Sequence, residues 1–192
     1  MDPLATSVLD FWFGAPGSPE HGTARAAWFR KDPAFDEEIR RAFGNVVEAT
    51  LAGEHGDWSA TAPGALARVV VLDQFPRNIY RDTPRAFAGD AAALVTAVDT
   101  IARGLDRTLE PHGRWFLYLP FEHAEDVPMQ HRSLELFGAL SAEMNDPAPL
   151  DWARRHAEVI FRFGRYPHRN AILGRASTPE ESAFLAQPGS RF

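Results

Sequence analysis

Apolar residues recur at helical spacing in several separate stretches of the chain. The clearest stretch runs from Phe35 through Ile39 to Leu51, with charged residues at most of the intervening positions. Side chains three and four positions apart share one face of an α-helix. We therefore predict an amphipathic helix that begins at Pro33 and ends near Gly53.

The same spacing predicts further helices along the rest of the chain. Val69, Val70 and Val71 are β-branched and favour a strand by propensity, but their apolar neighbours follow helical spacing, so we predict a helix there too. We expect Pro76 to end that helix and Pro120 to break a short aromatic stretch, because proline disfavours a helical residue before it. The predicted helices cover residues 3–13, 65–75, 84–103, 128–144, 150–163 and 179–187.

Helix boundaries are marked by a repeated signal. Asp or Thr precedes proline at Asp2, Asp32, Thr83 and Thr178, which is the pattern of an N-cap followed by proline at the first helical position. Gly164 is expected to end the helix before it. We predict an all-α fold in which residues 1–192 form a single domain of stacked antiparallel helix pairs; the helix starts are too irregular for a consensus repeat.

Composition and charge exclude several classes of function. The chain has 192 residues, no cysteine and a net charge of −6, which rules out thiolate chemistry and disfavours nucleic acid and anionic membranes as partners. No apolar run approaches the length of a membrane span, and the acidic start lacks the pattern of a signal peptide. We expect a cytoplasmic protein. Neither a GxGxxG motif nor a P-loop occurs, and we predict no cofactor.

Arginine replaces lysine almost completely. Lys31 is the only lysine among 20 basic residues. Genomic base composition explains this bias, and so does selection for planar, bidentate recognition of carboxylate or phosphate. Residues 152–175 contain six arginines against one acid, Glu158, so a local anion site is retained as a hypothesis.

Two segments contain an aromatic-proline pair followed by arginine and asparagine, directly in the first and after His168 in the second. We name residues 73–81 the first corner and residues 161–175 the second corner. We expect a rigid turn at each to position guanidinium and amide groups for a ligand; the alternative is that they bind helix-end carbonyl groups and are purely structural. The candidate ligand-binding residues are Asp73, Gln74, Arg77, Asn78, Arg81, Arg165, His168, Arg169, Asn170 and Arg175.

Three further residues are candidates for proton transfer. Histidine titrates near neutrality, so His123 or His156 could act as general acid or base, with Glu122 or Asp73 as the carboxylate that orients it. The alternative is an acidic helix start near Glu122 and a buried, hydrogen-bonded His156. No HExxH motif or other metal-ligand spacing is present, so we predict no metal site.

The motifs together resemble the bacterial domain of unknown function 924 family. The resemblance rests on the segments at residues 10–13, 72–81, 87–90, 119–125 and 162–178, in which Tyr166 replaces an expected phenylalanine. It covers nearly the whole chain. It implies an all-helical fold similar to tetratricopeptide-repeat superhelices, and no established activity.

Two functions follow as expectations. The first is a pocket for a small anionic molecule held by the corner arginines, with histidine as acid or base if a reaction takes place there. The second is a helical-repeat module that binds a peptide, for example through its C-terminal carboxylate. The sequence leaves the ligand, the reaction and the oligomeric state open.

Overall fold

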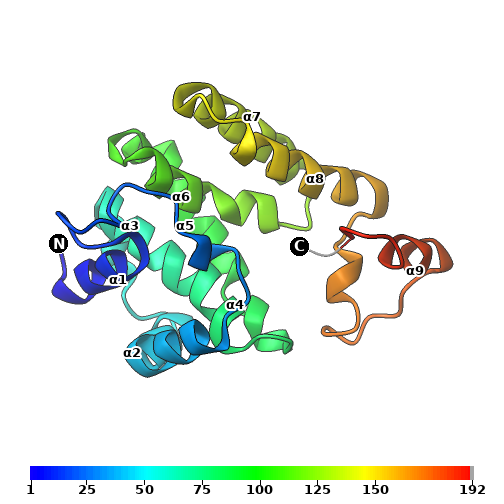
Figure 1. Cartoon of the computed structure of the whole chain (residues 1–192), viewed down its shortest axis with the longest axis horizontal. Coiled ribbons are helices and arrows are strands. Elements are labelled where there is room, and N and C mark those ends of the chain that lie inside the picture. The colour runs from blue at the N-terminus through cyan, green and yellow to red at the C-terminus, as the bar shows by residue number, and fades with distance from the viewer. Residues whose placement is uncertain (191–192) are drawn as a thin grey trace. The chain divides into compact units, whose positions relative to one another are not determined.

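The computed structural model describes residues 1–190, and within that range it is all-helical, as predicted (Figure 1). The α-helices are α1 (Pro3–Phe13), α2 (Pro33–Leu51), α3 (Ala62–Val69), α4 (Phe75–Ile79), α5 (Asp90–Ala102), α6 (Pro111–His123), α7 (Val127–Met144), α8 (Ala148–Phe163) and α9 (Pro179–Leu185). Short 3-10 turns join many of them. No helix among the described residues is both long and apolar enough to cross a bilayer.

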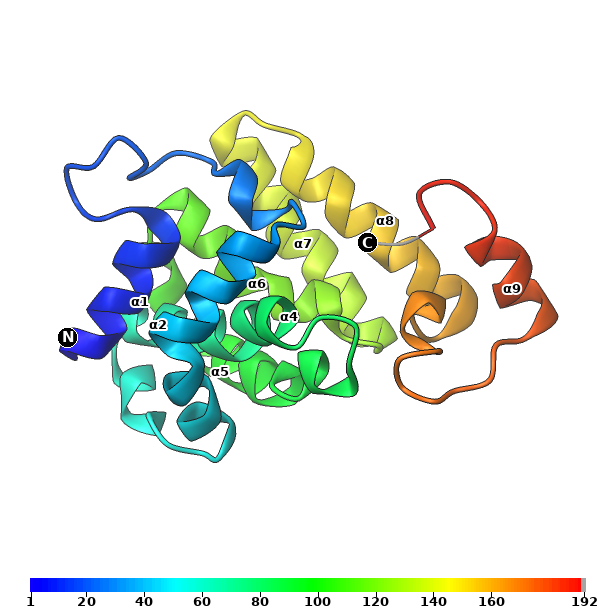
Figure 2. The ribbon, with the colours of Figure 1, turned by 60° about the horizontal axis from the view of Figure 1, so that its bottom comes forward.

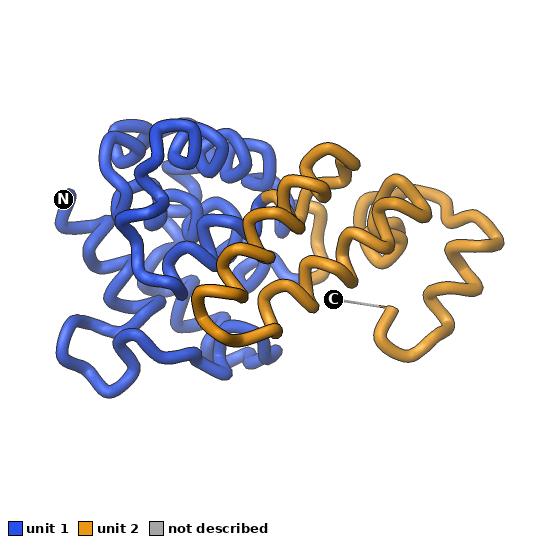
Figure 3. The backbone as a smooth tube through the Cα atoms, turned by 90° about the horizontal axis from the view of Figure 1, so that it is seen from above, with its two compact units in different colours: residues 1–81, 85–120 blue, residues 82–84, 121–192 orange. Residues whose placement is uncertain are grey.

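The chain divides into two compact units (Figure 3). Unit 1 comprises residues 1–81 and 85–120, and unit 2 comprises residues 82–84 with the described residues from Phe121 onward. Helix α6 passes from one unit into the other. The single domain over residues 1–192 stays a prediction, as does the resemblance to a tetratricopeptide-repeat superhelix.

Three of the four capping signals predicted from the sequence are confirmed; the exception is Thr83, which precedes a 3-10 turn. The carboxylate of Asp2 accepts hydrogen bonds from the first backbone N–H groups of α1, and Asp32 does the same for α2. Thr178 and Glu181 form a reciprocal capping box at α9. Gly164 ends α8 with φ of 69°, a conformation that glycine adopts at little cost.

The prediction that Pro76 ends a helix is wrong. A π-helical segment, Val70–Gln74, follows α3 directly and continues into α4. Each N–H of a π-turn reaches back five residues, so the wider turn absorbs the change of register. Pro76 then lies in the first turn of α4, where its missing N–H breaks no required hydrogen bond.

Two other helix boundaries also differ from the prediction. Pro120 lies inside α6, which continues to His123, so the aromatic stretch is part of a full helix. Pro84 begins a 3-10 turn, and α5 begins at Asp90, after Gly89. Local proline rules failed at these places because tertiary packing overrides a local preference.

The core of unit 1 is built around Trp12 of α1. Its side chain is fully buried, with edge contacts to Phe75 at 5.6 Å and to Phe116 at 5.5 Å between ring centroids. The indole N–H of Trp28 donates to the Trp12 carbonyl oxygen at 2.8 Å and so satisfies the end of α1. Helix α3 packs against α1 and α5, which fixes the platform of this unit.

Unit 2 is built on an antiparallel pair, α7 and α8, which lie side by side (Figure 2). Val159 and Ile160 of α8 are buried together with Tyr166 of the second corner. Phe163 and Phe184 pack against this group. The second corner is therefore attached to α8 by apolar burial as well as by chain connectivity.

Gly89 is needed for close packing within unit 1. A Cβ atom at this position would lie 2.1 Å from the carbonyl oxygen of Leu72 in the π-helical segment. The φ of Gly89 is −94°, which any residue can adopt, so the requirement is space and not backbone freedom. The start of α5 can approach the π-helical segment only because this side chain is absent.

We expect Gly89→Ala to lower the free energy of unfolding by about 2 kcal/mol or more, because backbone atoms must move to relieve the clash. Gly138→Ala in α7 is the matched control: nothing lies within 4 Å of its added Cβ. Alanine there should stabilise by about 0.5–1 kcal/mol through helix propensity. Urea denaturation of both variants measures this, and equal stability for Gly89→Ala and the parent would refute the packing constraint.

Candidate functional site

The predicted site residues fall into both units. The first corner belongs to unit 1 and the second corner to unit 2. The residues in unit 1 are Asp73, Gln74, Arg77, Asn78 and Arg81. Those in unit 2 are Glu122, His123, His156, Arg165, His168, Arg169, Asn170 and Arg175.

Carboxylates of unit 1 surround the first corner. Arg77 donates to both carboxylate oxygens of Asp90, at 2.8 and 3.0 Å, and to the Asp73 carbonyl oxygen at 2.6 Å. The buried carboxylate of Asp73 lies 3.3 Å from the same guanidinium and accepts a hydrogen bond from Gln74. These contacts tie the end of the π-helical segment to the start of α5.

Asp36 of α2 binds the rest of the first corner. Arg81 donates to both oxygens of its carboxylate, at 2.9 and 2.7 Å, and Asn78 donates to one of them at 2.7 Å. Asp36 is 9% exposed, so its charge needs this compensation. The contacts of the first corner favour its structural interpretation: its arginines cross-link α2, α4 and α5.

The second corner meets the acidic residues that follow α6. Arg175 donates to both carboxylate oxygens of Glu125, at 2.5 and 2.9 Å, and to the Tyr166 carbonyl oxygen at 3.1 Å. The backbone N–H of Tyr166 donates to Glu125 at 2.7 Å. Burial opposes ionisation of Glu125, but the hydrogen bonds from Arg175 and Tyr166 and the charges of Arg175 and Arg169 together lower the pKa of this carboxyl.

A second forked pair links the corner to α9. Arg165 donates to both oxygens of Glu181, at 2.6 and 2.8 Å, and this bond is the main reason that the pKa of Glu181 falls to about 2. Asn170 is fully buried; its amide donates to Glu181 and Ser177, and its carbonyl accepts from Arg175. Arg165, Asn170 and Arg175 thus hold the corner together.

Behind these pairs lies a buried polar group, here named the Glu122 cluster: Glu122, Gln130, His156, Tyr166 and Arg169. Each is less than 9% exposed. The hydroxyl of Tyr166 donates to the Glu122 carbonyl oxygen, and the Gln130 amide donates to that oxygen at 2.9 Å and to the Tyr166 hydroxyl at 3.1 Å. Burial raises the pKa of Tyr166, so its phenol stays neutral and can serve as a donor.

His156 is held against the Glu122 carboxylate. Its Nδ1 lies 3.1 Å from Glu122 Oε1 and 2.9 Å from the carbonyl oxygen of Trp152, one turn earlier in α8. Two acceptors at Nδ1 place the proton on this atom, which leaves Nε2 with the lone pair. Burial, with a smaller effect from His123, lowers the pKa of His156 to about 3, so the ring is neutral at pH 7.

Two half-buried histidines extend the cluster toward solvent. The His123 ring lies 6.2 Å from His156, and the His168 ring lies 5.5 Å from Tyr166, between centroids. The guanidinium of Arg169 lies over the Tyr166 ring at 4.6 Å, a cation–π contact that supports a buried positive charge. The structure therefore brings His123, His156, Glu122, His168 and Arg169 into one group.

The predicted site residues do not include several that complete these sites: Asp36, Asp90, Glu125, Gln130, Tyr166 and Glu181. Asp36 and Arg81 are 45 positions apart, and Glu125 and Arg175 are 50 apart. Partners so far apart in the sequence form no local pattern from which their contact could be predicted. Asp90 lies in the family-like motif at residues 87–90, and Glu181 lies in the capping box of α9. These two motifs were the only sequence signals that pointed to either residue.

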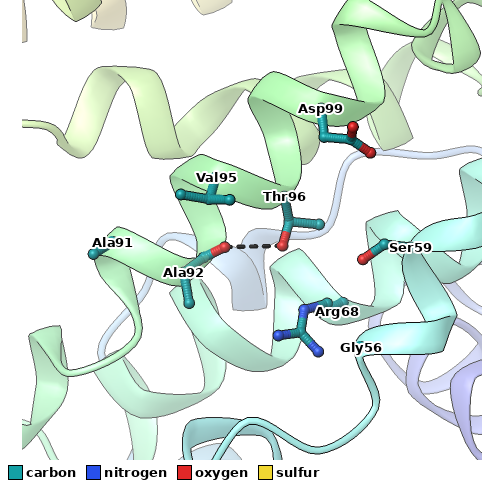
Figure 4. Close-up of a pocket in the computed structure, with 8 residues that line it drawn as sticks. All are labelled: Gly56, Ser59, Arg68, Ala91, Ala92, Val95, Thr96 and Asp99. Atoms are coloured by element: carbon teal, nitrogen blue, oxygen red, sulfur yellow. Dashed lines mark hydrogen bonds between the residues drawn. The ribbon is translucent and has the colours of Figure 1, made fainter.

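No three histidine, aspartate or glutamate side chains among residues 1–190 lie close enough together to hold a metal ion. Unit 1 has a cavity of about 460 Å³ that is open to solvent and is lined by residues of the 3-10 turn Gly56–Ala60, α3 and α5 (Figure 4). The chemistry-bearing group and this cavity are separate features. We treat the Glu122 cluster as the candidate site because titratable and charged side chains converge there.

Known proteins similar to the chain agree with this fold. The family described as "Bacterial protein of unknown function (DUF924)" matches residues 8–189. A solved structure, the protein of unknown function ATU0120 from Agrobacterium tumefaciens, is 38% identical; the match covers 95% of this chain and 97% of that chain, with a TM-score of 0.83. No curated protein matches the chain.

The buried, neutral His156 predicts a loss of stability in mild acid. The unfolded chain takes up a proton near the ordinary histidine pKa of 6.5, whereas the folded chain takes it up near 3. Stability therefore falls as pH drops below 6.5, and this residue accounts for about 2 kcal/mol between pH 7.5 and 5.

Urea denaturation at both pH values tests this expectation. His156→Gln should remove this part of the pH dependence, and His131→Gln, at an exposed position, is the matched control that should leave it intact. An identical pH dependence in the parent and in His156→Gln would show that His156 does not titrate as its burial requires.

Proposed function

Since this chain belongs to the DUF924 family of bacterial proteins of unknown function, we propose a function from the chemistry of its own residues: the protein binds a small anionic molecule at the Glu122 cluster, where His156 exchanges a proton. The observation that carries this proposal is the buried contact of 3.1 Å between His156 and Glu122. A carboxylate at one ring nitrogen orients the imidazole and leaves the other nitrogen able to accept a proton.

Proton exchange at His156 depends on the ligand. In the free protein the low pKa makes His156 a weak base. An anion bound beside the ring stabilises the protonated form and so raises this pKa toward neutrality. Binding of an anion is then coupled to uptake of a proton, and the affinity rises as the pH falls.

The positive charge for the anion comes from Arg169 and the histidines. Arg165 and Arg175 are each engaged by both oxygens of a carboxylate, at Glu181 and Glu125, so these two arginines position the corner. Arg169 is 6% exposed and lies beside Tyr166, within the cluster. Its charge already acts on His156, since it is one of the causes that lower the pKa of that ring.

The proposal confines the anion site to unit 2. The first corner then serves stability, because Asp36 and Asp90 bind its arginines. The α7–α8 pair is the part of the chain closest to a stacked helix-pair arrangement, and a peptide bound along such pairs is the competing function. Peptides therefore belong in the same binding screen as small anions.

We expect a thermal-shift screen with phosphate, pyrophosphate, malate, citrate and short peptides to find a small anion that raises the melting temperature by mass action. Its affinity should increase from pH 8 to pH 6 by up to about tenfold per pH unit. Arg169→Gln should abolish binding, and His156→Gln should remove the pH dependence. Isothermal titration calorimetry in buffers of different ionisation enthalpy measures the proton uptake directly.

Arg162→Gln is the matched control for this prediction. Arg162 belongs to the second corner but is exposed and pairs with exposed Glu180. Its loss should leave binding unchanged. A hit that binds equally well to Arg169→Gln and His156→Gln would place the site elsewhere, and a hit among the peptides alone would favour the repeat-module function.

A further inference from the structure

Unit 1 contains a cavity that the Glu122 cluster does not involve. Its volume is about 460 Å³, and it opens between the 3-10 turn Gly56–Ala60, α3 and α5 (Figure 4). All of its lining residues belong to unit 1, so the cavity is complete without any other part of the chain. The lining residues are Gly56, Ser59, Arg68, Ala91, Ala92, Val95, Thr96 and Asp99.

Arg68 supplies a positive charge to this cavity. It is half-buried on α3, and its Nη1 donates to the Glu54 carbonyl oxygen at 2.8 Å. Within the part of the chain that the structure describes, its guanidinium forms no ion pair at 4.0 Å or less. Burial lowers the pKa of Arg68, with the more distant charge of Asp57 acting in the opposite direction. A partly desolvated cation without a carboxylate partner is a position that an anion stabilises.

The opposite wall is apolar and comes from α5. Ala91, Ala92 and Val95 line the cavity, and Figure 4 shows all three on one helix. Val95 is 69% exposed, so its side chain is available to a ligand and contributes little to the core. The hydroxyl of Thr96 donates to the Ala92 carbonyl oxygen at 2.8 Å. Its proton is therefore used within the helix and is not offered to a ligand.

The remaining charge at the cavity limits the charge of the ligand. Asp99 is held by Arg103 at 2.9 Å, and Arg103 also donates to the Ser59 carbonyl oxygen at 2.8 Å. This pair is neutral as a whole, but its carboxylate lines the cavity and repels a second negative charge. A monoanion is therefore favoured over a dianion.

We infer that this cavity binds a small amphipathic monocarboxylate, with its carboxylate on Arg68 and its hydrocarbon part against Ala91, Ala92 and Val95. The planar guanidinium matches a carboxylate in geometry. Because the cavity has a cation at one side and an apolar wall at the other, its ligand needs both a negative charge and a hydrocarbon part.

Hexanoate and benzoate are suitable probes, with hexanamide and benzamide as neutral controls of the same shape. Methyl resonances of Ala91, Ala92 and Val95, followed by NMR in the full chain, report binding at this site. We expect saturable shifts with the carboxylates and affinities at least tenfold weaker for the amides. Equal responses to acid and amide, or no response of these methyl groups to the acids, would overturn the inference.

Two variants test the role of charge independently. Arg68→Gln should weaken benzoate binding at least tenfold. Val95→Asp should weaken it by repulsion, and because Val95 is exposed this variant is expected to fold even if Arg68→Gln does not. Arg107→Gln, at an exposed position of unit 1 outside the cavity, is the control that should leave the affinity unchanged. Unaltered affinity in folded Val95→Asp would exclude the cavity as the site.

Discussion

Pairing of each arginine fork with a carboxylate from a distant part of the same unit is the interaction on which this structure depends. In unit 1 the pairs are Arg77 with Asp90 and Arg81 with Asp36; in unit 2 they are Arg175 with Glu125 and Arg165 with Glu181. A partly buried charge that lost its partner would cost several kcal/mol. Each pair therefore stabilises the packing of the two elements that it joins.

Pairing with carboxylates distinguishes the roles of the two corners, which look alike in the sequence. Both corners contain arginine and asparagine after an aromatic-proline pair, yet the contacts of the first corner are accounted for by Asp36, Asp73 and Asp90. The second corner uses the same kind of pair to hold its own chain segment in place. It also contacts the titratable groups of the Glu122 cluster. The difference arises from the residues that each corner contacts: Tyr166 of the second corner bonds to Glu122 of α6, which lies against His156 of α8.

The sequence predicted what local chemistry determines. Asp2 and Thr178 begin helices, Gly164 ends one, and the amphipathic stretch from Phe35 to Leu51 is a helix because each signal acts within a few residues. Pro76 was misread because the π-helical segment before it changes the register, and nothing in the apolar pattern shows a π-turn. The partners of the arginines were out of reach because a pair such as Glu125 and Arg175 is joined only by the fold.

The near-absence of lysine has a consequence in alkaline solution. A lysine ammonium group loses its charge near pH 10.4, whereas a guanidinium group stays charged above pH 12. All four forked pairs use arginine, so they stay closed in base where lysine pairs would open. On the acid side a pair opens when its carboxyl group takes up a proton, and the pKa of about 2 keeps Glu181 charged in strongly acidic solution. The use of arginine in place of lysine therefore widens the pH range over which these pairs stay charged. In the composition the same preference is visible only as a bias.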